Sequence, residues 1–308
     1  MPYDDVPPAP APSSPGRAPR VPARVPARLR VPGRSVAALA VPVSLAALCL
    51  ALSGCGAGQP AEARPHPGGT GSPSAGPSPA GSAAGPLAGR TVVIDPGHNP
   101  GNSRHTGEIA EQVKIGTGAK ECDTTGTETD DGYPEARFTL DVAHRLRALL
   151  EERGAKVVLT QDGDRPFGPC VDERARIGNT AQADAVVSVH ADGSAVGNRG
   201  FHVILPDRVR GGGADTTEIV APSRDLGTRI AGTFARATGT APSNYIGDGT
   251  GLDVRKDLGG LNMSTVPKVF VECGNMRDPE DAALITAASW RQKAARGIGD
   301  GITSYLKG

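Results

Sequence analysis

The chain alternates between short apolar runs and longer stretches whose apolar residues recur at helical spacing. The short runs, rich in Val and Ile, predict strands at residues 91–95, 156–160, 185–190, 200–205 and 268–272. The longer stretches predict helices at residues 135–153, 172–181, 223–238 and 289–306. Strands that alternate with helices predict an α/β fold, in which a mostly parallel or mixed sheet has helices on both faces.

Three segments carry little regular pattern. Residues 99–134 are polar, and residues 208–222 and 245–260 are rich in Gly. Loops of this length in a compact domain are usually functional or disordered. We therefore expect no strand or helix in these segments.

The first 54 residues have the layout of an export signal. Arg-rich sequence precedes an uncharged apolar run at residues 36–52, and small residues follow it. The run ends in LSGC at residues 52–55, which resembles the lipobox of bacterial lipoproteins, where the Cys becomes the lipid-modified first residue. We expect a lipid anchor at Cys55 that holds the chain at the outer face of the cytoplasmic membrane. Plain secretion and an uncleaved membrane anchor are the alternatives.

The next segment, residues 55–88, consists mainly of Gly, Ala, Pro and Ser. Such a segment buries too little apolar surface to offset the entropy of ordering it, so it predicts a flexible tether. Residues 89–308 suffice for one domain with a sizeable core. The expected organisation is a signal at 1–54, a tether at 55–88 and a single globular domain at 89–308.

Charge and composition bear on the partners. The chain has 33 basic and 33 acidic side chains, and six of the Arg lie in the signal, so the remainder is slightly acidic. Nucleic-acid-binding domains usually have a basic excess, and an aromatic content of 3% offers few stacking platforms. Nucleic acid is therefore not expected as a partner. The lack of a heptad run or extra apolar segment favours a monomer.

Two cysteines of the globular region lie in loop-like sequence. Cys122 and Cys170 belong to an exported domain, where a disulfide is the natural interpretation. Closing such a loop contributes roughly 4 kcal/mol in the chain-entropy model. Two free thiols are the alternative. Cys273 directly follows a predicted strand and is expected to be a buried core thiol.

Polar residues end three of the predicted strands and begin one helix: His98, His190, Glu272 and Glu135. In an open α/β sheet, ligands bind beyond the carboxyl ends of the strands, so these side chains are expected at one rim. Two His and one carboxylate form a zinc site that leaves a fourth position for water. A second carboxylate can move the water's proton.

Spacing alone leaves the roles of Glu135 and Glu272 interchangeable. Each residue taken alone can instead have a structural role. A His at a strand end is often structural, and Glu135 at a helix start can simply complement the helix dipole. Only the joint arrangement favours a metal site.

Four segments carry a family resemblance. VVIDPGHNP, PEARFTLDVAHRLRALLEERGAKVVLTQDGD, ERARIGNTAQADAVVSVHADG and PKVFVECGNMRDPEDAALI follow one another in this order. The chain resembles zinc-dependent N-acetylmuramoyl-L-alanine amidases with a His-Glu-His metal site, most closely the actinobacterial members. The resemblance covers residues 90 to about 306, which is essentially the whole globular part.

The resemblance implies one zinc ion on His98, Glu135 and His190, with Glu272 as the catalytic carboxylate. It thereby indicates which of the two Glu residues binds the metal and which acts in catalysis. It also implies a zinc-hydrolase-like fold and a peptidoglycan or muropeptide substrate. In such enzymes water attacks the lactyl carbonyl of N-acetylmuramic acid, and the carboxylate passes a proton to the departing L-alanine amine.

Two other functions remain as alternatives. One is a zinc peptidase that cuts within the stem peptide, which only product analysis separates from the amidase. The other is a non-catalytic wall-binding lipoprotein. That class would be expected to lack one of the four rim residues, whereas all four are present here.

Overall fold

A computed structural model describes residues 85–308 of the chain. The expected signal at 1–54, the lipidation site Cys55 and most of the expected tether lie outside the described residues. No helix in the described part is both long and apolar enough to cross a membrane.

A six-stranded sheet forms the centre of the domain, in the order β4-β1-β5-β10-β6-β9. Only the β10–β6 pair is antiparallel, and the other four neighbouring pairs are parallel. The expected α/β fold with a mostly parallel sheet is therefore confirmed. The strands are β1 (Thr91–Pro96), β4 (Lys156–Leu159), β5 (Ala185–Asp192), β6 (His202–Pro206), β9 (Leu252–Arg255) and β10 (Lys268–Asn275).

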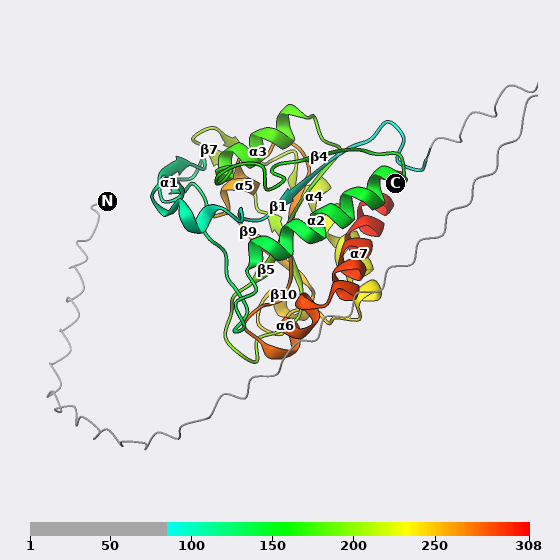
Figure 1. Cartoon of the computed structure of the whole chain (residues 1–308). Coiled ribbons are helices and arrows are strands. Elements are labelled where there is room, and N and C mark those ends of the chain that lie inside the picture. The colour runs from blue at the N-terminus through cyan, green and yellow to red at the C-terminus, as the bar shows by residue number, and fades with distance from the viewer. Residues whose placement is uncertain (1–84) are drawn as a thin grey trace, which may run out of the picture. The chain divides into compact units, whose positions relative to one another are not determined.

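Three long helices cover one face of the sheet: α2 (Glu135–Glu152), α4 (Val220–Thr238) and α7 (Ala288–Lys307). They bury the main core, in which Phe138, Leu146, Leu226, Ile230 and Ile298 pack against Val92, Val187, Val189 and Val271 of the strands. The opposite face carries α3 (Val171–Thr180) and the short α5 (Gly259–Asn262), with a smaller cluster around Val93 and Val186. Figure 1 shows α2 and α7 side by side, with α3 away from them.

Short elements appear in the segments where none was expected. They are η1 (Asn102–Arg104), α1 (Thr106–Ile109), β2 (Gln112–Lys114), β3 (Ala119–Glu121), β7 (Arg210–Gly211), β8 (Ala214–Asp215) and η2 (Gly247–Gly249). The edge strand β9 also lies in an expected loop. Each of these strands is at most four residues long, so the period-two alternation that identifies a strand hardly develops. The helix α6 (Pro279–Thr286) was also missed; Asp278 caps it by accepting from the amides of Glu280 and Asp281.

The folded part begins inside the segment that the composition assigns to the tether. Leu87 is fully buried in the main core, and its amide donates to the carbonyl of Arg153 at 2.9 Å. A Cβ on Gly85 would lie 2.3 Å from the same carbonyl oxygen, so the backbone packs tightly there. Residues 85–88 therefore belong to the domain, because one apolar side chain among small residues anchors them.

Candidate active site

The four rim residues come from four separate elements. His98 follows β1, Glu135 is the first residue of α2, His190 lies in β5 and Glu272 in β10. Three of them meet: His98 Nε2 lies 3.1 Å from Glu135 Oε2, and His190 Nδ1 lies 3.0 Å from Glu135 Oε1. One ligand atom from each of the three lies within 4.8 Å of the other two, close enough to share a metal ion.

Backbone amides hold Glu135 in this position. The amide of Thr127 donates to its Oε2 at 3.0 Å, and the amide of Ala191 donates to its Oε1 at 3.1 Å. Only 5% of the Glu135 side chain is exposed. The carboxylate is thereby fixed between the two imidazoles instead of pointing to solvent.

His98 occupies the turn that ends β1. Its φ is 60°, in the left-handed region that few residues other than Gly adopt. Arg174 of α3 donates to the carbonyls of Pro96 and His98, at 2.6 and 2.9 Å. His98 Nδ1 lies 3.0 Å from the carbonyl of Thr124, which can only accept. Nδ1 therefore carries a proton that it donates to this carbonyl, and Nε2, which faces Glu135, is the nitrogen that could bind a metal ion after losing its own proton.

Glu272 lies beside His190 in the sheet. The two are register partners across β5 and β10, so their side chains point to the same face. Burial raises the pKa of the Glu272 carboxyl well above its usual range, and the negative charges of Glu135 and Asp192 raise it further. A buried carboxyl with a raised pKa is suited to general acid–base work.

His98 and Glu135 each stabilise the charged form of the other. Burial disfavours the charged imidazole, but Glu135 and Asp123 outweigh it and raise the pKa of His98 to about 10. Burial likewise opposes ionisation of Glu135, but His98 and His190 outweigh it and lower the pKa of that carboxyl. A proton on His98 thus balances a charge that a bound cation would balance instead.

The buried carboxylate of Asp95 lies next to the turn that carries His98 and links it to neighbouring elements. Asp95, in β1 three residues before His98, is fully buried. Four side chains donate to it: Arg174 at 2.8 Å, Lys268 at 3.0 Å, Thr160 at 2.7 Å and Ser188 at 2.9 Å. These bonds tie β1 to α3, β5, β10 and the residue that follows β4, close to the turn that carries His98.

Two hollows adjoin the three clustered residues. A cavity of about 490 Å³ opens beside His98 and His190, and its other walls include Lys120, Leu258 and Phe270. A second hollow of about 840 Å³ runs along α2. Thr124 lines the first hollow and Thr125 and Gly126 line the second, so this short segment separates them. His98 and His190 line the first hollow, whereas the second is lined by Asn99, Pro134 and Ala136, the chain neighbours of His98 and Glu135.

Comparison with known proteins identifies the family. Residues 92–304 match the family model described as N-acetylmuramoyl-L-alanine amidase. The chain belongs to this family. An N-acetylmuramoyl-L-alanine amidase of Mycobacterium tuberculosis is 41% identical over 221 residues, which are 71% of this chain and 88% of the relative. The crystal structure of the amidase Ami1 from Mycobacterium smegmatis superposes with a TM-score of 0.65 at 41% identity, covering 71% of this chain and 98% of that one.

Family membership confirms the expected amidase activity. A second Ami1 structure, from Mycobacterium abscessus, also has a TM-score of 0.65 and 41% identity, over 71% of this chain and all of that chain. The match extends across the sheet and its helices, so the expected zinc-hydrolase-like fold of one domain is confirmed with it.

Some residues of the amidase site escaped sequence reasoning. Asp123, Thr124 and Thr127 lie in a stretch without regular pattern, yet each contacts a clustered rim residue. Gly126 has a φ of 75°, and a Cβ there would lie 2.8 Å from both Glu135 Oε2 and His98 Cδ2. The only sequence signal for this contact was the nearby Cys122, whose disulfide partner is Cys170 in the structure.

Proposed function

We propose that this amidase hydrolyses the bond between N-acetylmuramic acid and L-alanine in peptidoglycan with one zinc ion bound to His98, Glu135 and His190. The observation that carries the proposal is the approach of these three side chains from three elements to within 4.8 Å. Two imidazole nitrogens and one carboxylate oxygen are a donor set of catalytic zinc sites, and they leave a coordination position for water or substrate. The chemistry that such an ion supplies is Lewis acidity towards a carbonyl oxygen and activation of water.

Glu272 is proposed as the general base and acid. Its place beside His190 supports this role, since the strand register directs both side chains to one face. The raised pKa of its carboxyl means that it can accept a proton from water and pass it to the departing L-alanine amine. General acid–base residues contribute roughly 10²- to 10⁴-fold to the rate.

The substrate is a branched polymer, and one hollow lies on each side of the segment of Thr124 to Gly126. The cavity of about 490 Å³ and the hollow of about 840 Å³ can receive the two arms that meet at the scissile amide. The segment of Thr124 to Gly126 would then pass next to the bond that breaks.

Export and attachment complete the proposal. The apolar run and the LSGC motif support a signal at 1–54 and a lipid on Cys55, followed by a tether that lets the domain reach the wall from the outer face of the membrane. The domain is proposed to act as a monomer.

Mass spectrometry of a defined muramoyl-peptide, incubated with the protein and zinc, tests the function. The expected product is an intact stem peptide with a free L-alanine amine. The Glu272→Gln variant is expected to release at least about 100-fold less while binding zinc normally. Cleavage within the peptide would instead favour a stem peptidase, and loss of zinc binding in the variant would contradict the assignment of Glu272 as a base.

A further inference from the structure

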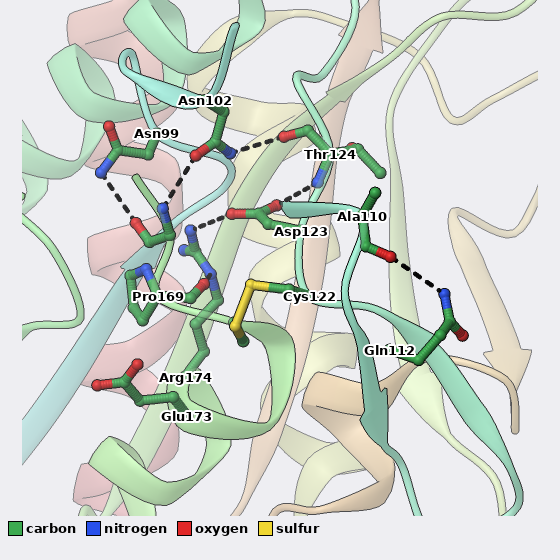
Figure 2. Close-up of a disulfide and its surroundings, with 12 residues drawn as sticks. Asn99, Asn102, Ala110, Gln112, Cys122, Asp123, Thr124, Pro169, Glu173 and Arg174 are labelled. Atoms are coloured by element: carbon green, nitrogen blue, oxygen red, sulfur yellow. Dashed lines mark hydrogen bonds and ion pairs between the residues drawn. A yellow bond between two sulfur atoms is a disulfide. The ribbon is translucent and has the colours of Figure 1, made fainter. Parts of the chain in front are cut away.

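Residues 122–126, here called the strap, contact the ring of His98. Figure 2 shows Cys122, Asp123 and Thr124 of the strap beside the disulfide and Arg174. The carbonyl of Thr124 lies 3.0 Å from His98 Nδ1, and the Thr124 hydroxyl lies 3.2 Å from it. Asp123 Oδ1 lies 3.5 Å from the same nitrogen. All of these contacts reach the nitrogen that faces away from Glu135, so the strap sets the rotation and the tautomer of the ring.

The strap is itself held by the start of α3. A disulfide joins Cys122 to Cys170, the residue before α3, with a Cα–Cα distance of 4.2 Å. The amide of Val171 donates to the carbonyl of Cys122 at 2.8 Å. One helical turn further on, Arg174 Nη2 donates to Asp123 Oδ2, also at 2.8 Å.

Arg174 connects the two sides of His98. The same Nη2 that bonds Asp123 also donates to the backbone carbonyl of His98 at 2.9 Å. The start of α3 therefore holds the backbone of His98 directly and its ring through the strap. Cys122, Asp123 and Arg174 are 1%, 6% and 4% exposed, so solvent does not substitute for these bonds.

At the point where the strap meets the ring, its further support is the buried side chain of Asn102, whose Nδ2 donates to the carbonyl of Thr124 at 2.7 Å. Residues 123–127 form neither helix nor strand. On one side the amides of Cys122 and Asp123 donate to the carbonyls of Glu111 and of Ile109, which ends the four-residue helix α1. On the other side the amide of Thr127 bonds Glu135. The disulfide is thus the strap's covalent attachment, and it leads directly to the start of α3.

We propose that the Cys122–Cys170 disulfide and the Asp123–Arg174 ion pair position the metal ligand His98, so that opening the disulfide weakens zinc binding without unfolding the domain. Partners of the non-ligating nitrogen fix the orientation of a metal-bound imidazole, and their loss typically costs about 10- to 100-fold in metal affinity. The inference rests on the zinc site proposed above. It makes zinc retention sensitive to the thiol–disulfide state of the protein's surroundings.

The test measures the zinc dissociation constant of the full-length protein by competition with a chromogenic chelator. The variant Cys122→Ser/Cys170→Ser is expected to bind zinc about 10- to 100-fold more weakly than wild type. Cobalt substitution gives a second readout, because the visible spectrum of the bound ion reports its ligand geometry. The spectrum is expected to change in the double variant.

The matched control is Leu226→Ala, a cavity variant in the core on the opposite face of the sheet. It lowers stability and leaves the strap intact, so its zinc affinity and cobalt spectrum are expected to equal those of wild type. Should the double serine variant fail to fold, Asp123→Asn carries the test, since it keeps the disulfide and removes the ion pair. It is expected to weaken zinc binding by about tenfold.

The outcomes separate this inference from the proposed function. A wild-type protein that binds no zinc overturns the metal site and the inference together. Wild-type protein that binds zinc, with unchanged affinity in the variants of the strap, overturns the positioning role alone. Equal weakening by Leu226→Ala also overturns it, because the effect would then follow from stability.

Discussion

Replacing Asp95 by Asn should show how strongly the domain depends on the charges buried beneath the site. The carboxylate is fully buried and accepts from both Arg174 and Lys268. Arg174 keeps a second carboxylate, Asp123, at 2.8 Å. Lys268 is also fully buried, and in the described part of the chain Asp95 is its only carboxylate partner. Asp95→Asn therefore leaves a buried ammonium group without a counter-charge.

The magnitude follows from that orphaned charge. Breaking a buried ion pair by removing one partner costs about 3–5 kcal/mol. In a domain of this size, such a loss lowers the melting temperature by roughly 6–20 °C, at about 2–4 °C per kcal/mol. Urea unfolding at pH 7, followed by circular dichroism, measures the loss directly. The fold-neutral comparison is Lys156→Met, whose lysine is exposed in β4.

A second substitution tests the reasoning. Removal of both charges, in Asp95→Asn/Lys268→Met, leaves no unpaired ion, and a buried pair replaced by neutral groups is often close to neutral in stability. The double variant should therefore recover about 2 kcal/mol or more relative to Asp95→Asn. A single variant that loses less than about 1 kcal/mol, or a double variant less stable than the single one, would refute the argument.

Three further outcomes are expected. Burial opposes ionisation of Asp95, but Lys268 and Arg174 outweigh it and lower the pKa of its carboxyl in the folded protein. The charge of Asp95 therefore stabilises the fold at pH values above its unfolded pKa of about 3.9. In urea unfolding, the difference in stability between wild type and Asp95→Asn should narrow as the pH falls below about 4. Zinc bound at the proposed site must displace the proton that the pKa of about 10 keeps on His98. Calorimetry should therefore show that zinc binding releases a proton and that the affinity for zinc rises with pH. A zinc affinity that does not depend on pH would contradict this prediction. Gly126→Ala should abolish tight zinc binding, because its Cβ would collide with Glu135 and His98. The control is Gly132→Ala, where φ is 79° and no atom lies within 4 Å of the added Cβ. It should lose only about 1–2 kcal/mol to backbone strain in thermal unfolding and should still bind zinc.

The long elements were predictable because one face of each is apolar over many residues. In α2, Phe138, Val142, Leu146 and Leu150 recur every four residues and are all fully buried, which is the pattern that the sequence displays. The strand β9 was not predictable, since its four residues are followed by polar sequence and only one neighbour, β6, pairs with it. Short elements of this kind form because tertiary pairing selects them.

The candidate site also has residues whose placement could be predicted from the sequence and residues whose placement could not. His98, His190 and Glu272 stand at strand ends, and parallel strands bring their carboxyl ends together, so their convergence follows from the order of elements. The contacts of Asp123, Thr124 and Gly126 depend on the path of an irregular loop between residues 99 and 134. No periodicity encodes that path, and it is determined by links to distant residues such as Cys170 and Arg174.

The docking of Leu87 beside Arg153 has a geometric consequence for an anchored enzyme. Arg153 directly follows the last residue of α2, whereas Glu135, at the proposed zinc site, is the first residue of that helix. An 18-residue helix is roughly 27 Å long, so the chain enters the domain at the end remote from the catalytic rim. If the lipid on Cys55 forms as proposed, the pull of the anchor acts on the back of the domain. The point of attachment then lies away from the catalytic rim, so the rim can approach the wall without the anchored end of the domain standing between enzyme and substrate.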